Sequence, residues 1–135
     1  MTSINELAVI VTSLLAIALG SIWYSPLVFG AHWQRAAGLT DFDLALSRSA
    51  LVRSLTVAFL SNVVVLFVIA HLVRIAAAFD ISLFELAGAL IVLIAASLAS
   101  MVVWEKRPFL YFIIHSGYAA LVISLGVVVI SYWPW

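Results

Sequence analysis

Four long apolar stretches constrain this chain more than any other feature of its sequence. Each is close to the roughly 20 residues that an α-helix needs to cross the hydrocarbon core of a bilayer. Hydrophobic residues make up 67% of the 135 residues and charged residues only 9%, a balance that no soluble domain of this size could bury. We therefore predict membrane spans at about residues 6–24, 51–75, 83–104 and 109–132.

The predicted fold is an all-α membrane protein, a bundle of four transmembrane helices in a single integral membrane domain over residues 1–135. Backbone groups in lipid must satisfy their own hydrogen bonds, and stretches of this length indicate helices rather than the short alternating segments of a barrel. No basic residue precedes the first apolar stretch, so we expect a retained span rather than a cleaved signal peptide.

Charge, cysteine content and motifs narrow the chemistry. The formal net charge is zero and no basic cluster is present, so we expect no nucleic-acid partner. The chain has no cysteine, which excludes disulfides and thiolate metal sites. Neither a nucleophile elbow nor an H-E-x-x-H motif occurs, and every acidic residue lies near a predicted helix end. We therefore expect no enzymatic activity and no metal site.

Two predicted helices begin with the same capping pattern. Ser3 with Glu6, and Ser82 with Glu85, fit the capping box S-x-x-E before an apolar run. In this pattern the serine oxygen accepts a backbone N–H bond, and the glutamate bonds back to the backbone of the serine. Both glutamates also lie at the positive end of a helix dipole, so capping is the preferred interpretation of their role.

The two capped helices also match each other along their length. Placing residues 3–22 over residues 82–101 without gaps gives eight identities in twenty positions. A possible tandem two-helix repeat follows, in which the first and third helices have the same orientation. The even-numbered helices show no comparable match.

The connection after the first span is long and has an interfacial segment. Pro26 ends the span, because the residue before a proline is disfavoured in helical conformation. Residues 27–37 mix aromatic and basic side chains, as is typical of the membrane interface, and Gly38 ends this segment. Thr40 then serves as a helix cap, and we expect the second long helix to begin near Asp41 and to project from the membrane.

The basic residues predict the orientation. The second connection turns at Asp80, and the third is a polar hairpin at residues 105–108. The basic residues of the first and third connections are Arg35, Arg48, Arg53, Lys106 and Arg107. Only Arg74 lies on the opposite side. The positive-inside rule therefore predicts that both connections are cytoplasmic and both termini outside.

Several polar side chains are predicted to lie together in the cytoplasmic half of the bundle, at a rise of about 1.5 Å per residue. This polar layer consists of Asn62, His115, Tyr118, Ser97 and Ser100. His115 and Tyr118 are three residues apart and share a helix face. The layer fits a cavity for a ligand, a proton or a tetrapyrrole, and it equally fits interhelical hydrogen bonds with no further role.

His71 and Arg74 form a second polar pair, near the outer end of the second span. Arg74 can extend to the interface along its aliphatic chain. His71 and His115 are predicted in opposite halves of the membrane, so one chain cannot bring both to one metal. A haem or chlorophyll with one histidine ligand, or a bis-histidine site across a dimer through His115, remains a weaker alternative.

The end of the first span carries the sequence Gly-x-x-Trp-Tyr-Ser-Pro-x-x-Phe-Gly-x-x-Trp, residues 20–33. This stretch resembles the pattern that ends the first span in the bacterial membrane proteins called domain of unknown function 1761. Residues 107–118 also resemble the start of that family's fourth helix, although the family pattern has asparagine where this chain has His115. The resemblance implies a four-helix protein of the bacterial cytoplasmic (inner) membrane, and it implies no activity.

The same stretch has a physical interpretation as an interface with lipid or with a partner protein. The residues that we name for such an interface are Trp23, Tyr24, Pro26, Phe29 and Trp33, together with His71 and Arg74. The sequence favours a non-enzymatic protein that forms a homo-oligomer or an accessory subunit of a larger membrane complex. The alternative is a small transporter or channel that uses the polar layer.

Overall fold

The computed structural model describes residues 4–45 and 47–134, and the described residues form six helices. They are α1 (Glu6–Trp23), α2 (Gly30–Ala37), α3 (Asp41–Leu44), α4 (Arg48–Ala78), α5 (Leu83–Trp104) and α6 (Phe109–Tyr132). α1, α4, α5 and α6 are each long and apolar enough to cross a membrane, with mean hydropathies of 2.0, 2.3, 2.5 and 2.2. This confirms the predicted all-helical fold with four spans and short helices after the first.

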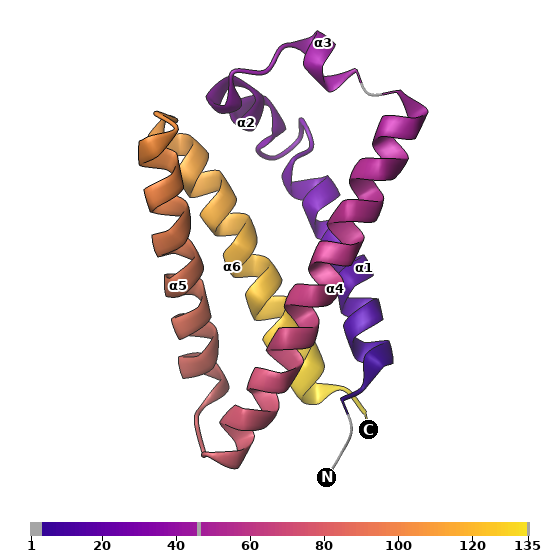
Figure 1. The fold of residues 1–135 in the computed structure, drawn as a ribbon, viewed down its shortest axis with the longest axis vertical. Coiled ribbons are helices and arrows are strands. Elements are labelled where there is room, and N and C mark those ends of the chain that lie inside the picture. The colour runs from indigo at the N-terminus through magenta and orange to yellow at the C-terminus, as the bar shows by residue number, and fades with distance from the viewer. Residues whose placement is uncertain (1–3, 46, 135) are drawn as a thin grey trace.

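The four long helices are not packed equally. α1, α4 and α6 contact one another, whereas α5 packs mainly on α6 (Figure 1). α1 and α5 run in one direction along the bundle, and α4 and α6 run in the other (Figure 1). At the end that carries α2, the first half of α4 diverges from α5 and α6, so the bundle is wider there (Figure 1).

The hydrophobic core lies in the half of the bundle that is remote from α2. Its buried members are aliphatic side chains of α1, α4 and α6: Val9, Leu66, Ile69, Ala70, Val73, Ile123, Val127 and Ile130. The chain termini lie at this same end (Figure 1). The end beside α2 is therefore held by other contacts, which are described below.

Helix capping explains where the elements begin. Ser82 and Glu85 form the predicted capping box: the Ser82 hydroxyl accepts from the Glu85 backbone N–H at 3.2 Å, and the Ser82 backbone N–H donates to the carboxylate at 3.0 Å. α1 is instead capped by Asn5, whose side-chain oxygen accepts from the Ala8 backbone N–H at 3.1 Å. The predicted cap Ser3 lies outside the described residues.

The prediction that the second long helix begins near Asp41 is wrong. Thr40 does form a capping box with Asp43, but the helix it begins, α3, ends after four residues at Leu44. Ala45 has φ −74° and ψ 71°, outside the helical region, so the helix ends there although no glycine or proline is present. α4 starts separately, with the Ser47 hydroxyl accepting from the Ala50 backbone N–H at 3.3 Å.

The remaining turns agree with the predicted positions. Gly38 ends α2 in the left-handed conformation, with φ 70°. Asp80 has φ 58° in the turn between α4 and α5, and Lys106 has φ 54° in the hairpin between α5 and α6. Pro108 then occupies the N-cap position of α6.

Candidate functional site

The turn after α1 positions a group of aromatic side chains. Tyr24 ends α1, and the Phe29 backbone N–H bonds to the Trp23 carbonyl at 3.1 Å, which folds the chain back toward α2. Gly30 completes this turn: a Cβ at this position would lie 2.6 Å from the Ser25 carbonyl carbon, so only glycine allows the two backbone segments to approach.

Tyr24 lies at the centre of what we call the Tyr24 cluster. Its hydroxyl is 3.0 Å from Nδ1 of His115, and its ring centroid is 5.4 Å from that of Tyr118 and 5.5 Å from that of Trp33. Tyr111 adds a further ring, 4.2 Å from the His115 ring by centroid. One side chain thus joins the end of α1 to α2 and α6.

Two further hydrogen bonds tie α1 to α6. The Tyr118 hydroxyl donates to the Ala16 carbonyl at 3.0 Å, and the Trp23 indole N–H donates to the Ile114 carbonyl at 3.1 Å. Gly20 permits the first of these, because a Cβ there would lie 2.9 Å from the Tyr118 hydroxyl oxygen. These side-chain bonds join α1 and α6 at the end of the bundle that is remote from the aliphatic cluster around Leu66.

A cavity of about 340 Å³ lies between α1, α4 and α6, beside the Tyr24 cluster. Its polar lining comes from Asn62 on α4, Tyr118 on α6, and Tyr24 and Ser21 on or after α1. The structure therefore brings together Asn62 and Tyr118, two members of the predicted polar layer. It adds the Tyr24 hydroxyl, which the sequence interpretation had placed at the membrane interface.

Ser97 and Ser100 lie elsewhere. Both are on the exposed side of α5, and the Ser97 hydroxyl donates to the Leu93 carbonyl of its own helix at 2.9 Å. Because α5 packs mainly on α6, these hydroxyls are separated from the cavity that Asn62 lines. The polar layer predicted from depth alone is thus divided between two faces of the bundle.

Two buried polar atoms of the Tyr24 cluster have no hydrogen-bond partner within the described residues. They are Nε2 of His115 and the indole Nε1 of Trp33. If the Tyr24 hydroxyl donates to Nδ1 of His115, then Nε2 carries a proton and both atoms are N–H donors. Each of these atoms is then suited to a hydrogen-bond acceptor, such as a water or a carbonyl oxygen.

The site has limited capacity for a metal or a tetrapyrrole. Within residues 4–45 and 47–134, no group of three or more histidine, aspartate or glutamate side chains could hold a metal ion. His115 is the ionisable side chain of the cluster that could ligate iron, and Nε2 is the nitrogen not engaged with Tyr24. That atom is enclosed by protein, so a haem could reach it only after the cluster moved.

The predicted interface residues of the first connection face partly inward. Phe29 packs against Trp23, with ring centroids 4.5 Å apart, and Trp33 packs against Tyr24. Pro26 is exposed in the turn, beside Leu27, which is 94% exposed. Of the interface residues predicted in the first connection, Pro26 is thus the exposed one, and the aromatic members are partly buried.

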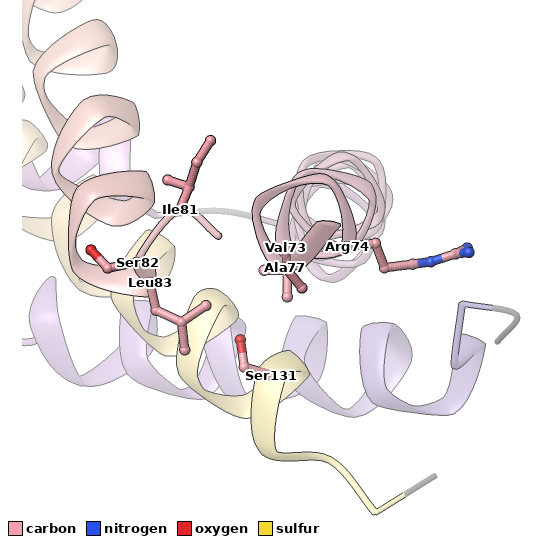
Figure 2. A pocket seen from close by; sticks show the side chains of 7 residues that line it. All are labelled: Val73, Arg74, Ala77, Ile81, Ser82, Leu83 and Ser131. Atoms are coloured by element: carbon pink, nitrogen blue, oxygen red, sulfur yellow. The ribbon is translucent and has the colours of Figure 1, made fainter. Parts of the chain in front are cut away.

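His71 and Arg74 lie on the exposed side of α4, whereas His115 is on α6. Nδ1 of His71 is 2.9 Å from the Phe67 carbonyl of the same helix. Arg74 borders a cavity of about 480 Å³ whose polar lining includes Ser131, but its side chain points away from that serine (Figure 2). These two residues share no site with the Tyr24 cluster.

Sequence reasoning did not identify Tyr111 as part of the site, or Tyr24 as its centre. The available signal was the density of aromatic residues at the end of the first span and at the start of the fourth, residues 23–33 and 109–118. Both segments were assigned to the same side of the membrane, so aromatic stacking between them could have been expected.

Comparison with known proteins identifies the family. No curated protein and no solved structure matches the chain. A family match covers residues 7–131, nearly the whole of the four-span fold. The chain is a multi-pass membrane protein that belongs to the family described as "Protein of unknown function (DUF1761)".

Proposed function

We propose that this protein is a non-enzymatic membrane subunit that acts in an assembly, either with further copies of itself or as an accessory subunit of a larger complex. The observation that carries the proposal is the low burial of α5. In the most apolar stretch of α5 only 6% of the residues are buried, against 33% in the corresponding stretch of α6. A span that its own bundle covers so little has a large face for a neighbouring helix.

The composition of this face favours a protein neighbour over lipid alone. Beside the large side chains of Val92 and Leu93, small or hydroxylated side chains are exposed along it, namely Ala89, Ala96, Ser97 and Ser100. In membranes, helices associate through small residues that allow close backbone approach and through interhelical hydrogen bonds from serine. Acyl chains offer neither kind of contact.

The absence of cysteine makes a direct test possible. Ala96→Cys is expected to give a disulfide-linked dimer on oxidation in native membranes, if α5 faces α5 of a second copy. Val128→Cys is the matched control, because Val128 is 52% exposed on α6, and it should remain unlinked.

Purification in a gentle detergent, followed by mass analysis, tests the accessory-subunit form. A protein that stays monomeric and alone in both experiments would contradict the proposal.

A second candidate function is transport of a small polar solute or ion. It is favoured by the cavity that Asn62, Tyr118 and Tyr24 line within the spans. Asn62→Leu and His115→Ala should then abolish any flux that the wild-type protein supports in vesicles. If both variants transport as wild type does, the polar side chains serve only to join helices. An absorption spectrum without a Soret or chlorophyll band would eliminate the weaker pigment-binding alternative.

The proposed location is the cytoplasmic membrane of a bacterium, with the α2 end in the cytoplasm. It is supported by the distribution of basic residues: Arg35 on α2, Arg48 and Arg53 on the first turns of α4, and Lys106 and Arg107 in the α5–α6 hairpin. Reporter fusions at the C-terminus test this orientation, since a cytoplasmic C-terminus would reverse it.

A further inference from the structure

A cavity separate from the Tyr24 cluster lies between α2 and the start of α6. Its volume is about 400 Å³, and its lining is His32, Arg35 and Ala36 from α2 with Pro108 and Leu110 from the start of α6. The basic groups come from one helix and the apolar groups come mainly from the other. A phospholipid has the same division at the level of its phosphate, where the charged group meets the first methylene groups.

The basic side chains of this cavity have no carboxylate partner within the described residues. Nε of Arg35 donates to the Ala31 carbonyl at 3.2 Å, which leaves the terminal guanidinium nitrogens for another acceptor. His32 precedes Arg35 by three residues, so the two side chains lie on one face of α2. Together they provide donors to an anion that approaches from the membrane surface.

The acidic residues that follow α2 are engaged elsewhere. Asp41 accepts from the Gln34 side-chain amide at 2.9 Å. Asp43 accepts from the Thr40 hydroxyl at 2.6 Å and from the Thr40 backbone N–H at 2.7 Å. Neither carboxylate therefore neutralises the Arg35 guanidinium by a direct ion pair.

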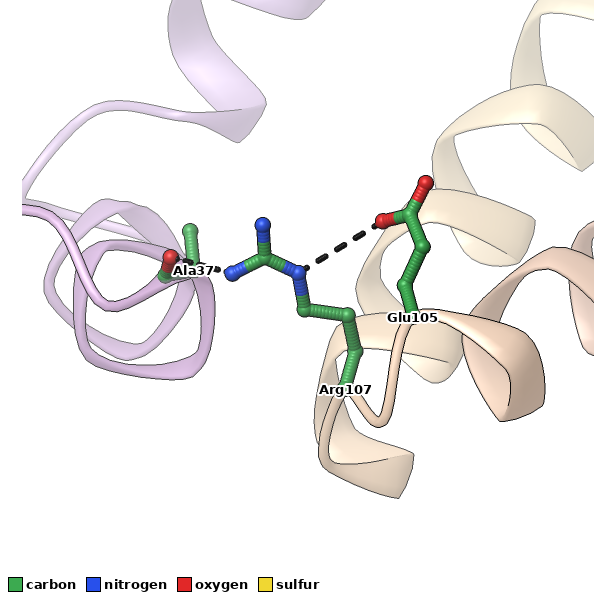
Figure 3. Close-up of polar contacts among 3 residues, drawn as sticks. All are labelled: Ala37, Glu105 and Arg107. Carbon is green, nitrogen blue, oxygen red and sulfur yellow. Dashed lines mark hydrogen bonds and ion pairs between the residues drawn. The ribbon is translucent and has the colours of Figure 1, made fainter.

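Arg107 holds the two walls of the cavity in place. One terminal nitrogen of its guanidinium donates to the Ala37 carbonyl at the end of α2, at 2.6 Å, and Nε is 3.5 Å from the Glu105 carboxylate (Figure 3). The guanidinium carbon also lies 5.7 Å from the centroid of the Tyr111 ring. Arg107 is thus a positioning residue that joins the α5–α6 hairpin to α2.

From this arrangement we propose that the cavity binds the phosphate of an anionic phospholipid. Arginine presents a planar set of donors that matches phosphate oxygens, and an interfacial cavity of low polarity strengthens each contact. The lipid source is favoured over free phosphate because the neighbouring surface of α6 is apolar and bare: Phe109 is 72% exposed and Leu110 is 43% exposed. Acyl chains would cover this surface, which inorganic phosphate cannot do.

The test measures lipid binding to the purified full-length protein by native mass spectrometry. Phosphatidylglycerol and phosphatidylcholine are titrated separately, and Arg35→Gln and His32→Gln are compared with wild type. The expected result is a preference for phosphatidylglycerol and a loss of about tenfold in its affinity in Arg35→Gln, which is the usual scale for one charge-assisted hydrogen bond. His32→Gln should weaken binding in the same direction.

The chain contains its own matched control. His71 and Arg74 have the same spacing on α4, but the cavity that both of them line is formed only by α4 and the residue that ends it. Arg74 also borders the cavity of about 480 Å³, but its side chain points away from Ser131 there (Figure 2). Arg74→Gln should therefore leave phosphatidylglycerol affinity unchanged. An equal loss in Arg74→Gln, or equal affinity for the two lipids, would overturn the proposal. Competition by millimolar inorganic phosphate would assign the cavity to free phosphate instead of a lipid, and would also overturn it.

Discussion

The Tyr24 hydroxyl and Nδ1 of His115 lie 3.0 Å apart at the end of the bundle that is remote from the aliphatic cluster around Leu66. At the scale of single residues, this contact and the hydrogen bond from Tyr118 to the Ala16 carbonyl hold α1 and α6 together, as core packing holds the helices together at the other end. In a low-dielectric setting an unpaired polar group raises the free energy of the folded state, so removing one partner should destabilise the whole cluster.

Tyr24→Phe removes one hydroxyl and keeps the ring. We expect it to destabilise the protein by about 1 kcal/mol, because His115 then loses its hydrogen-bond partner while remaining half-buried. The measurement is reversible unfolding in mixed micelles. Tyr132→Phe is the control, since Tyr132 is 77% exposed, and it should unfold as wild type does. Identical stability of the two variants would show that the Tyr24 hydroxyl contributes nothing.

Asp43 provides a pH-dependent prediction outside the spans. Hydrogen bonds from the Thr40 hydroxyl and then from the Thr40 backbone N–H lower the pKa of Asp43 below its ordinary value of 3.8. The capping contribution is therefore complete above that ordinary value, and it is lost as the pH falls through the lower folded-state pKa. Thr40→Val should raise the pKa of Asp43 in an NMR titration. Thr56→Val, on α4, should leave it unchanged.

At the scale of elements, local chemistry determined most of what could be predicted. The capping box at Ser82 and the stop at Gly38 follow from short-range hydrogen bonding and backbone sterics, so they can be recognised in a sequence. The end of the helix at Ala45 could not be recognised in the sequence, because no glycine or proline marks it. The start of α4 depends on a competing cap at Ser47. Thr40 and Ser47 are both suitable N-cap residues, and both begin a helix.

The turn between α1 and α2 depends on one glycine. Gly30→Ala should cost about 2 kcal/mol and disrupt the Tyr24 cluster, because the added methyl group would meet the Ser25 backbone. Gly88 on α5 is the matched control: an added Cβ there has open space, so Gly88→Ala should be neutral or stabilising by up to about 1 kcal/mol. Intrinsic tryptophan fluorescence reports the cluster, and thermal unfolding reports the stability. Equal effects at both glycines would contradict this account of the turn.

At the scale of the whole molecule, the packing between helices could not be predicted from the sequence. Depth along a span follows from counting residues, and Asn62 and Tyr118, which it placed at similar depth, line one cavity. The rotation of each helix about its own axis cannot be found by counting residues, because almost every position of these spans is apolar and no polar face marks the outside. Ser97 was therefore assigned to the polar layer although α5 turns it away from the other helices.

The uneven core predicts an uneven response to core substitutions on one helix. Leu66→Ala should destabilise the protein by about 2–5 kcal/mol, because Leu66 is fully buried between α4 and α6. Leu55→Ala, on the same helix but 44% exposed, should change the stability by less than about 0.5 kcal/mol. Steric-trap or detergent unfolding distinguishes them. Similar losses at both positions would mean that the first half of α4 is packed as firmly as the second.

The divergence of α4 has a mechanical consequence. The helix is anchored by its second half, so the segment from Leu66 back to Arg48 is a rigid arm about 27 Å long, and a tilt of about 10° displaces its end by about 5 Å. Leu55, Ala58 and Asn62 lie on this arm and line the cavity beside Tyr118. The width of that cavity thus depends on the tilt of this one helix.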